Sequence, residues 1–196
     1  MIVREPAIAY GKQKYSVAEY LELEDAATEK HEYYKGELFA MSGAKMPHNH
    51  ITSNLVGSLG RELSGKPCKP FGSDTRVHIE KNTLFTYPDV TVVCGKVITL
   101  NDDDYNVLNP TIIFEVLSTS TKHYDSGEKF KLYQDIPTLK EYVMVDSESV
   151  SVAVWRISEE GKWVLTERKK ISETLLLHSI DVSLTIAEIY TDVSLT

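Results

Sequence analysis

One stretch in the first third of the chain carries an apolar residue at every fourth position. Residues with this spacing lie on one face of an α-helix, so we expect a helix from His48 to about Leu63. Pro47 stands before its first turn, and Gly65 and Pro67 are typical of its end. The apolar stripe consists of Ile51, Leu55, Leu59 and Leu63.

Four later segments are rich in β-branched and aromatic residues and are expected to form strands. The third is apolar at nearly every position, which is typical of a central strand buried on both faces. A helix from Ser126 to about Ile136, closed by Pro137, would connect the third segment to the fourth, and the polar stretch 101–109 predicts a loop. The four segments are Phe71–Ile79, Phe85–Val93, Thr111–Leu117 and Glu141–Val145.

Shorter elements are expected at both ends of the chain. They are a helix at Ser16–Leu23 capped by Ser16 and Glu19, a hairpin at Glu32–Met41 that turns at Lys35-Gly36, a second hairpin of Val150–Arg156 and Lys162–Arg168, and a short helix at Thr185–Tyr190.

These elements fit one domain of the mixed α/β (α+β) class that spans residues 1–196. The composition, 42% hydrophobic and 26% charged, is ordinary for a globular protein and provides one core. We expect a central mixed sheet flanked by helices in 47–147. An N-terminal helix and hairpin would precede it in 14–42, and the C-terminal hairpin and short helix would follow in 148–196.

The composition also bears on the compartment and on partners. No apolar run approaches the ~20 residues of a membrane span, and the N-terminal region has no apolar block like that of a signal peptide. Cys68 and Cys94 have no C-x-x-C spacing, so neither a disulfide framework nor a structural zinc site is expected. These features predict a cytoplasmic protein without a membrane partner.

The formal net charge is −8. Neutralisation of phosphates supplies most of the affinity of nucleic-acid binders, so this charge argues against a protein that coats DNA. It leaves room for an enzyme with a local basic groove, because metal ions can supply positive charge within a site.

Glu115 is the residue that points most directly to chemistry. Its neighbours in the strand are apolar, so we expect its carboxylate to be buried. A buried carboxylate is costly unless it is paired, protonated or bound to a metal. A purely structural role, in which a salt bridge or hydrogen bonds stabilise the Glu115 carboxylate, would explain its burial equally well.

Asp89 follows Pro88 at the entrance of the preceding apolar segment. Alone it could be a turn or strand-cap residue. Together with Glu115 it gives two carboxylates on neighbouring strands, and Mg²⁺ typically takes one or two carboxylates while keeping several waters. The pair therefore predicts a site for a hard cation.

Three more residues are weaker candidates. Lys129 shares a helical face with apolar residues, so it should reach the edge of the core, either at the site or as a lysine that covers apolar surface. His48 stands at the start of the first long helix, where a surface role is common. Asp74 could contribute a third carboxylate or could pair with Arg76 on the surface.

The ordered set of these motifs resembles the PD-(D/E)XK nuclease superfamily. More narrowly, it resembles the Uma-two family, whose members are described as restriction endonucleases. The matching residues are Glu32 and Glu37 around the first turn, His48, Asp74, Tyr87-Pro88-Asp89-Val90, the run from Ile113 to Thr121, Asp125 with Lys129, and Glu141-Tyr142.

This resemblance implies a restriction-endonuclease-like core and a Mg²⁺- or Mn²⁺-dependent endonuclease that hydrolyses DNA. Asp89, Glu115 and the carbonyl of Val116 would hold the metal, with Lys129 near the reacting water and His48 and Asp74 lining the site. The superfamily usually has Glu-x-Lys, but Leu117 stands at that lysine position, and Lys129 is the expected replacement.

Two other functions remain open at this stage. The chain could be an inactive module of the same fold that binds nucleic acid or protein, or a structural protein in which a Lys or Arg fills the Asp89–Glu115 pair. A homodimer is a further expectation, because many nucleases that cut duplex DNA act as dimers.

Overall fold

The computed structural model describes residues 14–118, 122 and 124–195. The N-terminal layer begins with α1 (Val17–Ala26), and Ser16 and Glu19 form the expected capping box at its start. A hairpin of β1 (His31–Tyr34) and β2 (Glu37–Ala40) follows. Its turn residues Lys35 and Gly36 have φ values of 49° and 87°, a conformation that favours glycine.

The long amphipathic helix is confirmed as α2 (Met46–Glu62), which begins two residues before the expected start. The four residues of its apolar stripe are all buried. Pro47 lies in its first turn, where proline is tolerated because the amide there has no helical partner.

Two of the four expected strands are each divided into two. The first forms β3 (Cys68–Gly72) and β4 (Arg76–Ile79), and the second forms β5 (Leu84–Thr86) and β6 (Val90–Cys94). In both cases the chain leaves one sheet and enters another. The second break falls at Pro88, which has no N–H to donate to a ladder and therefore favours the end of a strand. The prediction of single strands was therefore wrong.

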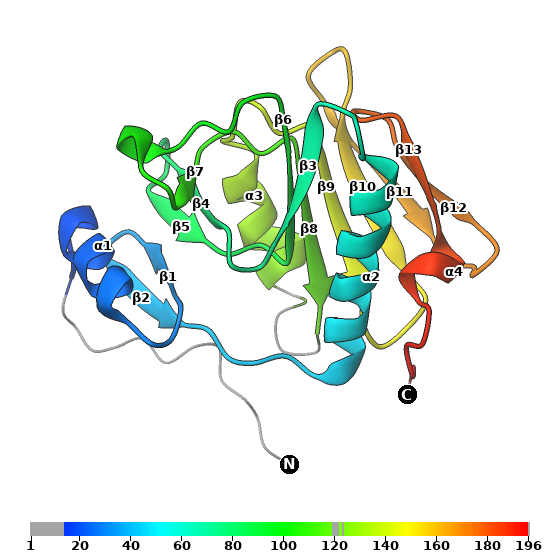
Figure 1. Ribbon diagram of the computed structural model, residues 1–196, viewed down its shortest axis with the longest axis horizontal. Coiled ribbons are helices and arrows are strands. Elements are labelled where there is room, and N and C mark those ends of the chain that lie inside the picture. Colours follow the sequence, from blue (N-terminus) through cyan, green and yellow to red (C-terminus); the bar gives the residue numbers. More distant parts are fainter. Residues whose placement is uncertain (1–13, 119–121, 123, 196) are drawn as a thin grey trace.

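Two sheets carry most of the fold (Figure 1). The five-stranded sheet has the order β2-β1-β5-β4-β7, with β7 at Asn106–Val107. The six-stranded sheet has the order β11-β10-β9-β8-β6-β3. Its remaining strands are β8 (Ile112–Leu117), β9 (Glu141–Asp146), β10 (Val152–Ile157) and β11 (Trp163–Arg168).

The expected central strand is confirmed as β8, since it pairs parallel with β9 on one side and antiparallel with β6 on the other. All six of its residues are buried. The sheet is mixed and flanked by helices, as expected. The C-terminal hairpin is also confirmed, as β10 and β11.

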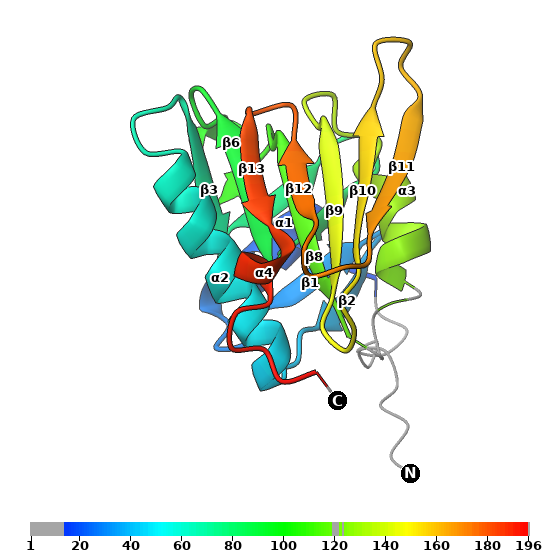
Figure 2. The same cartoon turned by 90° about the vertical axis from the view of Figure 1, so that its right-hand side faces the viewer.

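Side-chain alternation along β8 divides the interior into two cores. Phe114 and Val116 face α2 and the hairpin of β12 (Thr174–Leu177) and β13 (Val182–Thr185), which the sequence did not predict (Figure 2). The short helix α4 (Ile186–Ile189) closes this side. Ile113 and Leu117 face β4, β5 and α3 (Phe130–Tyr133). Glu115 shares that second face by alternation.

The helix expected from Ser126 begins two residues earlier, and its first part is a π-helix. This π-helix, η2 (Tyr124–Lys129), leads directly into α3. The expected loop 101–109 contains one 3₁₀ turn, η1 (Leu100–Asp102), and the short β7. Within the described ranges, every helix is too short or too polar to cross a membrane.

Cys68 and Cys94 form a disulfide, so the expectation from their spacing that disulfides are absent was wrong. They face each other across the antiparallel pair of β3 and β6, with a Cα–Cα distance of 3.9 Å. Spacing along the chain does not reveal such a contact, because it arises from the register of two strands.

Candidate active site

Asp89 lies at the break between the two sheets, in the residue before β6. The register of β6 and β8 pairs Val90 with Phe114, so its continuation brings Asp89 opposite Glu115. The Val116 amide donates a hydrogen bond of 2.7 Å to Asp89 Oδ2. The Pro88 break thus holds the Asp89 carboxylate against the central strand, beside the residue that the sequence singles out.

Glu115 is buried, as expected, with 4% of its surface exposed. The Tyr133 hydroxyl donates a hydrogen bond of 2.6 Å to Glu115 Oε1, and Lys129 Nζ lies 2.9 Å from the same oxygen. Burial raises the pKa of Glu115 to about 8, against the opposing effect of the Lys129 charge. The nearby Asp125 and Asp89 carboxylates act in the same direction as burial.

Lys129 reaches this cluster from the end of η2 and is itself 5% exposed. Besides Glu115, its Nζ lies 3.0 Å from Glu32 Oε1 and 3.8 Å from Asp125 Oδ1. Burial lowers the pKa of Lys129, but the charges of Glu115 and Glu32 outweigh it and hold that pKa well above its ordinary value. Lys129 is therefore a charged lysine inside a carboxylate cluster and does not cover outer surface.

Glu32, Tyr133 and Asp125 were not among the expected site residues. Glu32 comes from β1. Its neighbour Tyr33 packs with Tyr20, Leu38 and Phe85 in a third apolar cluster, and Glu32 is on the other face of the strand, in contact with Lys129. The Thr86 hydroxyl also donates to Glu32. Tyr133 follows Lys129 by four residues, so the shared helical face was a usable signal for it.

His48 lies in the first turn of α2, and its Nε2 is 3.2 Å from Asp89 Oδ1. Burial lowers the pKa of His48, but the hydrogen bond and charge of Asp89 outweigh it and raise that pKa overall. Its Nδ1 is buried without a hydrogen-bond partner among the described residues. The structure thus brings His48, Asp89, Glu115 and Lys129 together. We call these four residues and Glu32 the carboxylate cluster.

Asp74 does not join this cluster by any contact within the described chain. It lies in the turn between β3 and β4 with a side chain that is 96% exposed, and it pairs with Lys30 at 2.6 Å. The expected surface pair of Asp74 with Arg76 is not formed either, because Arg76 is 4% exposed and bonds to Asn106.

The oxygen donors of the carboxylate cluster fit a small hard cation. No three His, Cys, Asp or Glu side chains in the described ranges are grouped closely enough to hold a metal alone. Mg²⁺ needs fewer, since one or two carboxylates with a backbone carbonyl and waters suffice. Asp89 and Glu115, with the Val116 carbonyl, could provide such a set at the junction of β6 and β8.

The comparisons with known proteins agree with this architecture. Residues 17–187 match the Uma2 family model, described as “Putative restriction endonuclease”. Two Synechocystis sp. proteins are similar: “Uncharacterized protein slr1290” is 34% identical over 97% of each chain, and “Uncharacterized protein sll1609” is 37% identical over 78% of this chain and 86% of its own.

A crystal structure from Anabaena variabilis, described as a putative nuclease belonging to DUF820, has the same fold. Its TM-score is 0.74 over 90% of this chain and 98% of its own, at 15% identity. The family match covers both the β6–β8 junction and the helix that carries Lys129. The chain therefore belongs to the Uma2 family.

Proposed function

We propose that the protein is a metal-dependent endonuclease that hydrolyses phosphodiester bonds in DNA, with Asp89 and Glu115 as metal ligands. The observation that carries this proposal is the hydrogen bond from the Val116 backbone amide to the Asp89 carboxylate, which fixes that carboxylate beside the buried Glu115. The family description as a nuclease supports the same chemistry.

Mg²⁺ or Mn²⁺, when bound, supplies charge to offset the scissile phosphate and lowers the pKa of bound water. The chain provides the remaining functions. Lys129, held charged by Glu115 and Glu32, donates N–H groups toward the reacting water or the phosphate oxygens. His48 holds Asp89 in place through its Nε2.

The departure from Glu-x-Lys fits this assignment. Leu117 stands two residues after Glu115 and packs in the core with α3 and β4, so its position contributes no cation. Lys129 comes from the helix to the same carboxylate instead. The positive charge beside Glu115 is thus supplied by Lys129 of the helix and not by the residue two positions after Glu115 in the strand.

The test is cleavage of single-stranded, linear duplex and supercoiled DNA with Mg²⁺ or Mn²⁺. We expect Asp89→Ala to lose activity by about 10²-fold or more, the size of effect seen when one transition-state contact is removed. Asp104→Ala, which changes an exposed aspartate, is the matched control. Equal activity of Asp89→Ala and the wild-type protein would exclude the assignment.

Asp74→Ala is the informative second arm of this experiment. Asp74 is exposed and paired with Lys30, so the proposal includes it only if substrate binding brings it to the site. Unchanged activity would remove Asp74 from the site and leave the other four residues in place.

A second candidate is a module of the same fold that binds nucleic acid or protein without cutting. It is favoured by the protein partners of both carboxylates: His48 and the Val116 amide on Asp89, and Lys129 and Tyr133 on Glu115. Calorimetry with Mn²⁺ separates the two candidates, because the absence of binding at millimolar metal would favour the module.

A further inference from the structure

A cavity of about 380 Å³ is lined by the end of α1 and the segment after it, by the start of β4, and by residues just after β5 and just before β7. Its volume falls within the range of ligand sites, about 300–1,000 Å³. We call it the α1 pocket, and its walls include Asp25, Lys30, Asp74, Arg76, Tyr87 and Tyr105. No residue of the carboxylate cluster lines it.

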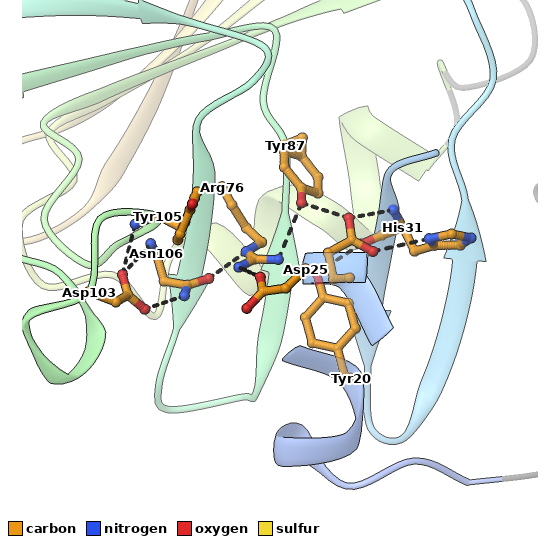
Figure 3. Close-up of polar contacts among 9 residues, drawn as sticks. Tyr20, Asp25, His31, Arg76, Tyr87, Asp103, Tyr105 and Asn106 are labelled. Atoms are coloured by element: carbon orange, nitrogen blue, oxygen red, sulfur yellow. Dashed lines mark hydrogen bonds and ion pairs between the residues drawn. The ribbon is translucent and has the colours of Figure 1, made fainter. Parts of the chain in front are cut away.

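Arg76 is the buried cation of this pocket and comes from the first position of β4 (Figure 3). Its Nε donates a hydrogen bond of 2.5 Å to Asn106 Oδ1. Asn106 is fixed in turn by Asp103, which accepts from the Asn106 backbone at 2.8 Å and from its side chain. The guanidinium is therefore held in one orientation by a chain of neighbours.

The other end of the guanidinium has weaker partners. Nη1 lies 3.4 Å from the Tyr87 hydroxyl, and Nη2 lies 3.6 Å from Asp25 Oδ1, beyond the usual hydrogen-bond distance. The Tyr87 hydroxyl already donates to Glu24 at 2.7 Å. The Tyr20 ring also lies beside the guanidinium, with its centroid 5.7 Å from Cζ. A guanidinium has five N–H donors, and the contacts to Asn106, Tyr87 and Asp25 occupy one each on Nε, Nη1 and Nη2.

The charges around the pocket exclude a simple anion site. Four carboxylates line it, from Glu24, Asp25, Glu29 and Asp74, against two cations. Lys30 is bound to Asp74, which leaves Arg76 as the only lining cation without a hydrogen-bonded carboxylate. A phosphate would meet an excess of negative charge, so the suitable ligand is neutral.

The positions of these groups define the ligand further. It needs acceptors for the Nη groups of Arg76, a donor for the Asp25 carboxylate beside them, and a flat face for an aromatic wall. Tyr105, with 64% of its surface exposed, is available for stacking. Guanine combines all three, since its O6 and N7 accept from arginine and its N1 and N2 carry N–H donors.

We infer that the α1 pocket binds a guanine base, between Arg76, Asp25 and Tyr105. The origin of that base in a nucleic-acid strand rests on the proposed function, and the phosphates of such a strand would have to lie outside the pocket, away from its four carboxylates. Tyr87 in the pocket is two residues before Asp89, while the preceding Thr86 bonds to Glu32 in the carboxylate cluster. The end of β5 thus lies between the two sites, because Thr86 contacts the cluster and Tyr87, just after the strand, lines the pocket.

The experiment is calorimetric titration of the full chain with 2′-deoxyguanosine in EDTA, with the other three deoxynucleosides and inorganic phosphate as comparison ligands. We expect deoxyguanosine to bind more tightly than the other deoxynucleosides by about tenfold, and phosphate not to bind. Absence of deoxyguanosine binding at millimolar concentration, or equal binding of deoxyadenosine, would overturn the inference.

Two exposed substitutions locate the site without disturbing the fold. Tyr105→Ala removes the stacking face, and Asp25→Asn removes the acceptor, so each should weaken binding by about tenfold. Glu159→Gln, at an exposed acidic residue of the β10–β11 turn, is the matched control and should bind as the wild type does. Unchanged affinity in both pocket variants would place the base elsewhere.

This result is independent of cutting. Asp89→Ala should bind deoxyguanosine as the wild-type protein does, because the titration contains no metal and no scissile bond. Absence of DNA cleavage by the wild-type protein, with intact deoxyguanosine binding, would therefore contradict only the proposed function. Cleavage without deoxyguanosine binding would contradict only the α1 pocket.

Discussion

The molecule has two buried cations that differ in what surrounds them. Lys129, 5% exposed, lies within 3.0 Å of both Glu115 and Glu32, which are themselves buried or nearly so. Arg76, 4% exposed, has an amide and a hydroxyl as its hydrogen-bond partners, and its nearest carboxylate belongs to Asp25, whose side chain is 60% exposed.

The difference shows how similar residues serve different purposes. In the carboxylate cluster, the cation is surrounded by carboxyl oxygens, which are also the ligands that a hard metal ion prefers. In the α1 pocket, the cation is held by neutral groups beside an open volume, so its remaining donors can face a ligand. The carboxylates around Lys129 therefore suit a metal site, and the remaining N–H donors of Arg76 suit the binding of a ligand.

The largest expected effect comes from removing each cation. Lys129→Met leaves Glu115 and Glu32 buried without their counter-charge, and we expect the free energy of unfolding to fall by about 3 kcal/mol. Arg76→Met leaves mainly neutral groups behind and should cost about 2 kcal/mol. Urea denaturation measures both, with Lys131→Met, on the exposed side of α3, as a control that changes little. A greater loss at Arg76 than at Lys129 would reverse the comparison.

Two tyrosines allow a more closely matched test. Tyr133 donates to the buried Glu115, and Tyr87 donates to Glu24, which also accepts from the His31 amide. Tyr133→Phe should cost about 2 kcal/mol, because Glu115 then keeps a single partner, Lys129, among the described contacts. Tyr87→Phe should cost about 1 kcal/mol, since Glu24 keeps two partners, the amide and the ring nitrogen of His31. Equal losses in urea denaturation would argue that the two environments are equivalent.

The sequence predicted the carboxylate cluster better than the α1 pocket, for a physical reason. Burial of Glu115 and the inward face of Lys129 follow from periodicities within one strand and one helix. The contact of Lys129 with Glu32 depends on which face of a four-residue strand meets the core, and that is set by the packing of β1 on β5.

The pocket has no comparable signal. Arg76 receives its partners from β7, the segment after β5 and the end of α1, and no spacing along the chain brings those elements together. The same limit explains the disulfide and the β12–β13 hairpin. The division at Pro88 is different, because proline was visible in the sequence and its lack of a donor favoured two strands over one.

Metal addition distinguishes the two regions with a smaller effect. If Mn²⁺ binds the carboxylate cluster, a concentration ten times the Kd raises the free energy of unfolding by about 1.4 kcal/mol. Asp89→Ala should lose this stabilisation, and Asp25→Asn should keep it. Thermal unfolding with Mn²⁺ and after EDTA measures both, and stabilisation that persists in Asp89→Ala would move the metal away from the cluster.

The smallest expected effect is a pH dependence of the free energy of unfolding that arises from His78 in β4, the strand that also carries Arg76. Burial lowers the pKa of His78 below its ordinary 6.5, with the Leu84 carbonyl and Glu80 opposing that shift and Arg76 adding to it. Between the lowered pKa and 6.5, the unfolded chain binds a proton that the folded chain does not. Stability is therefore complete above pH 6.5 and falls below it, by at most about 1.4 kcal/mol per pH unit. Urea denaturation at pH 7.5 and 5.5 should show a smaller loss for His78→Gln than for the wild type, and an equal loss would assign the dependence to other groups.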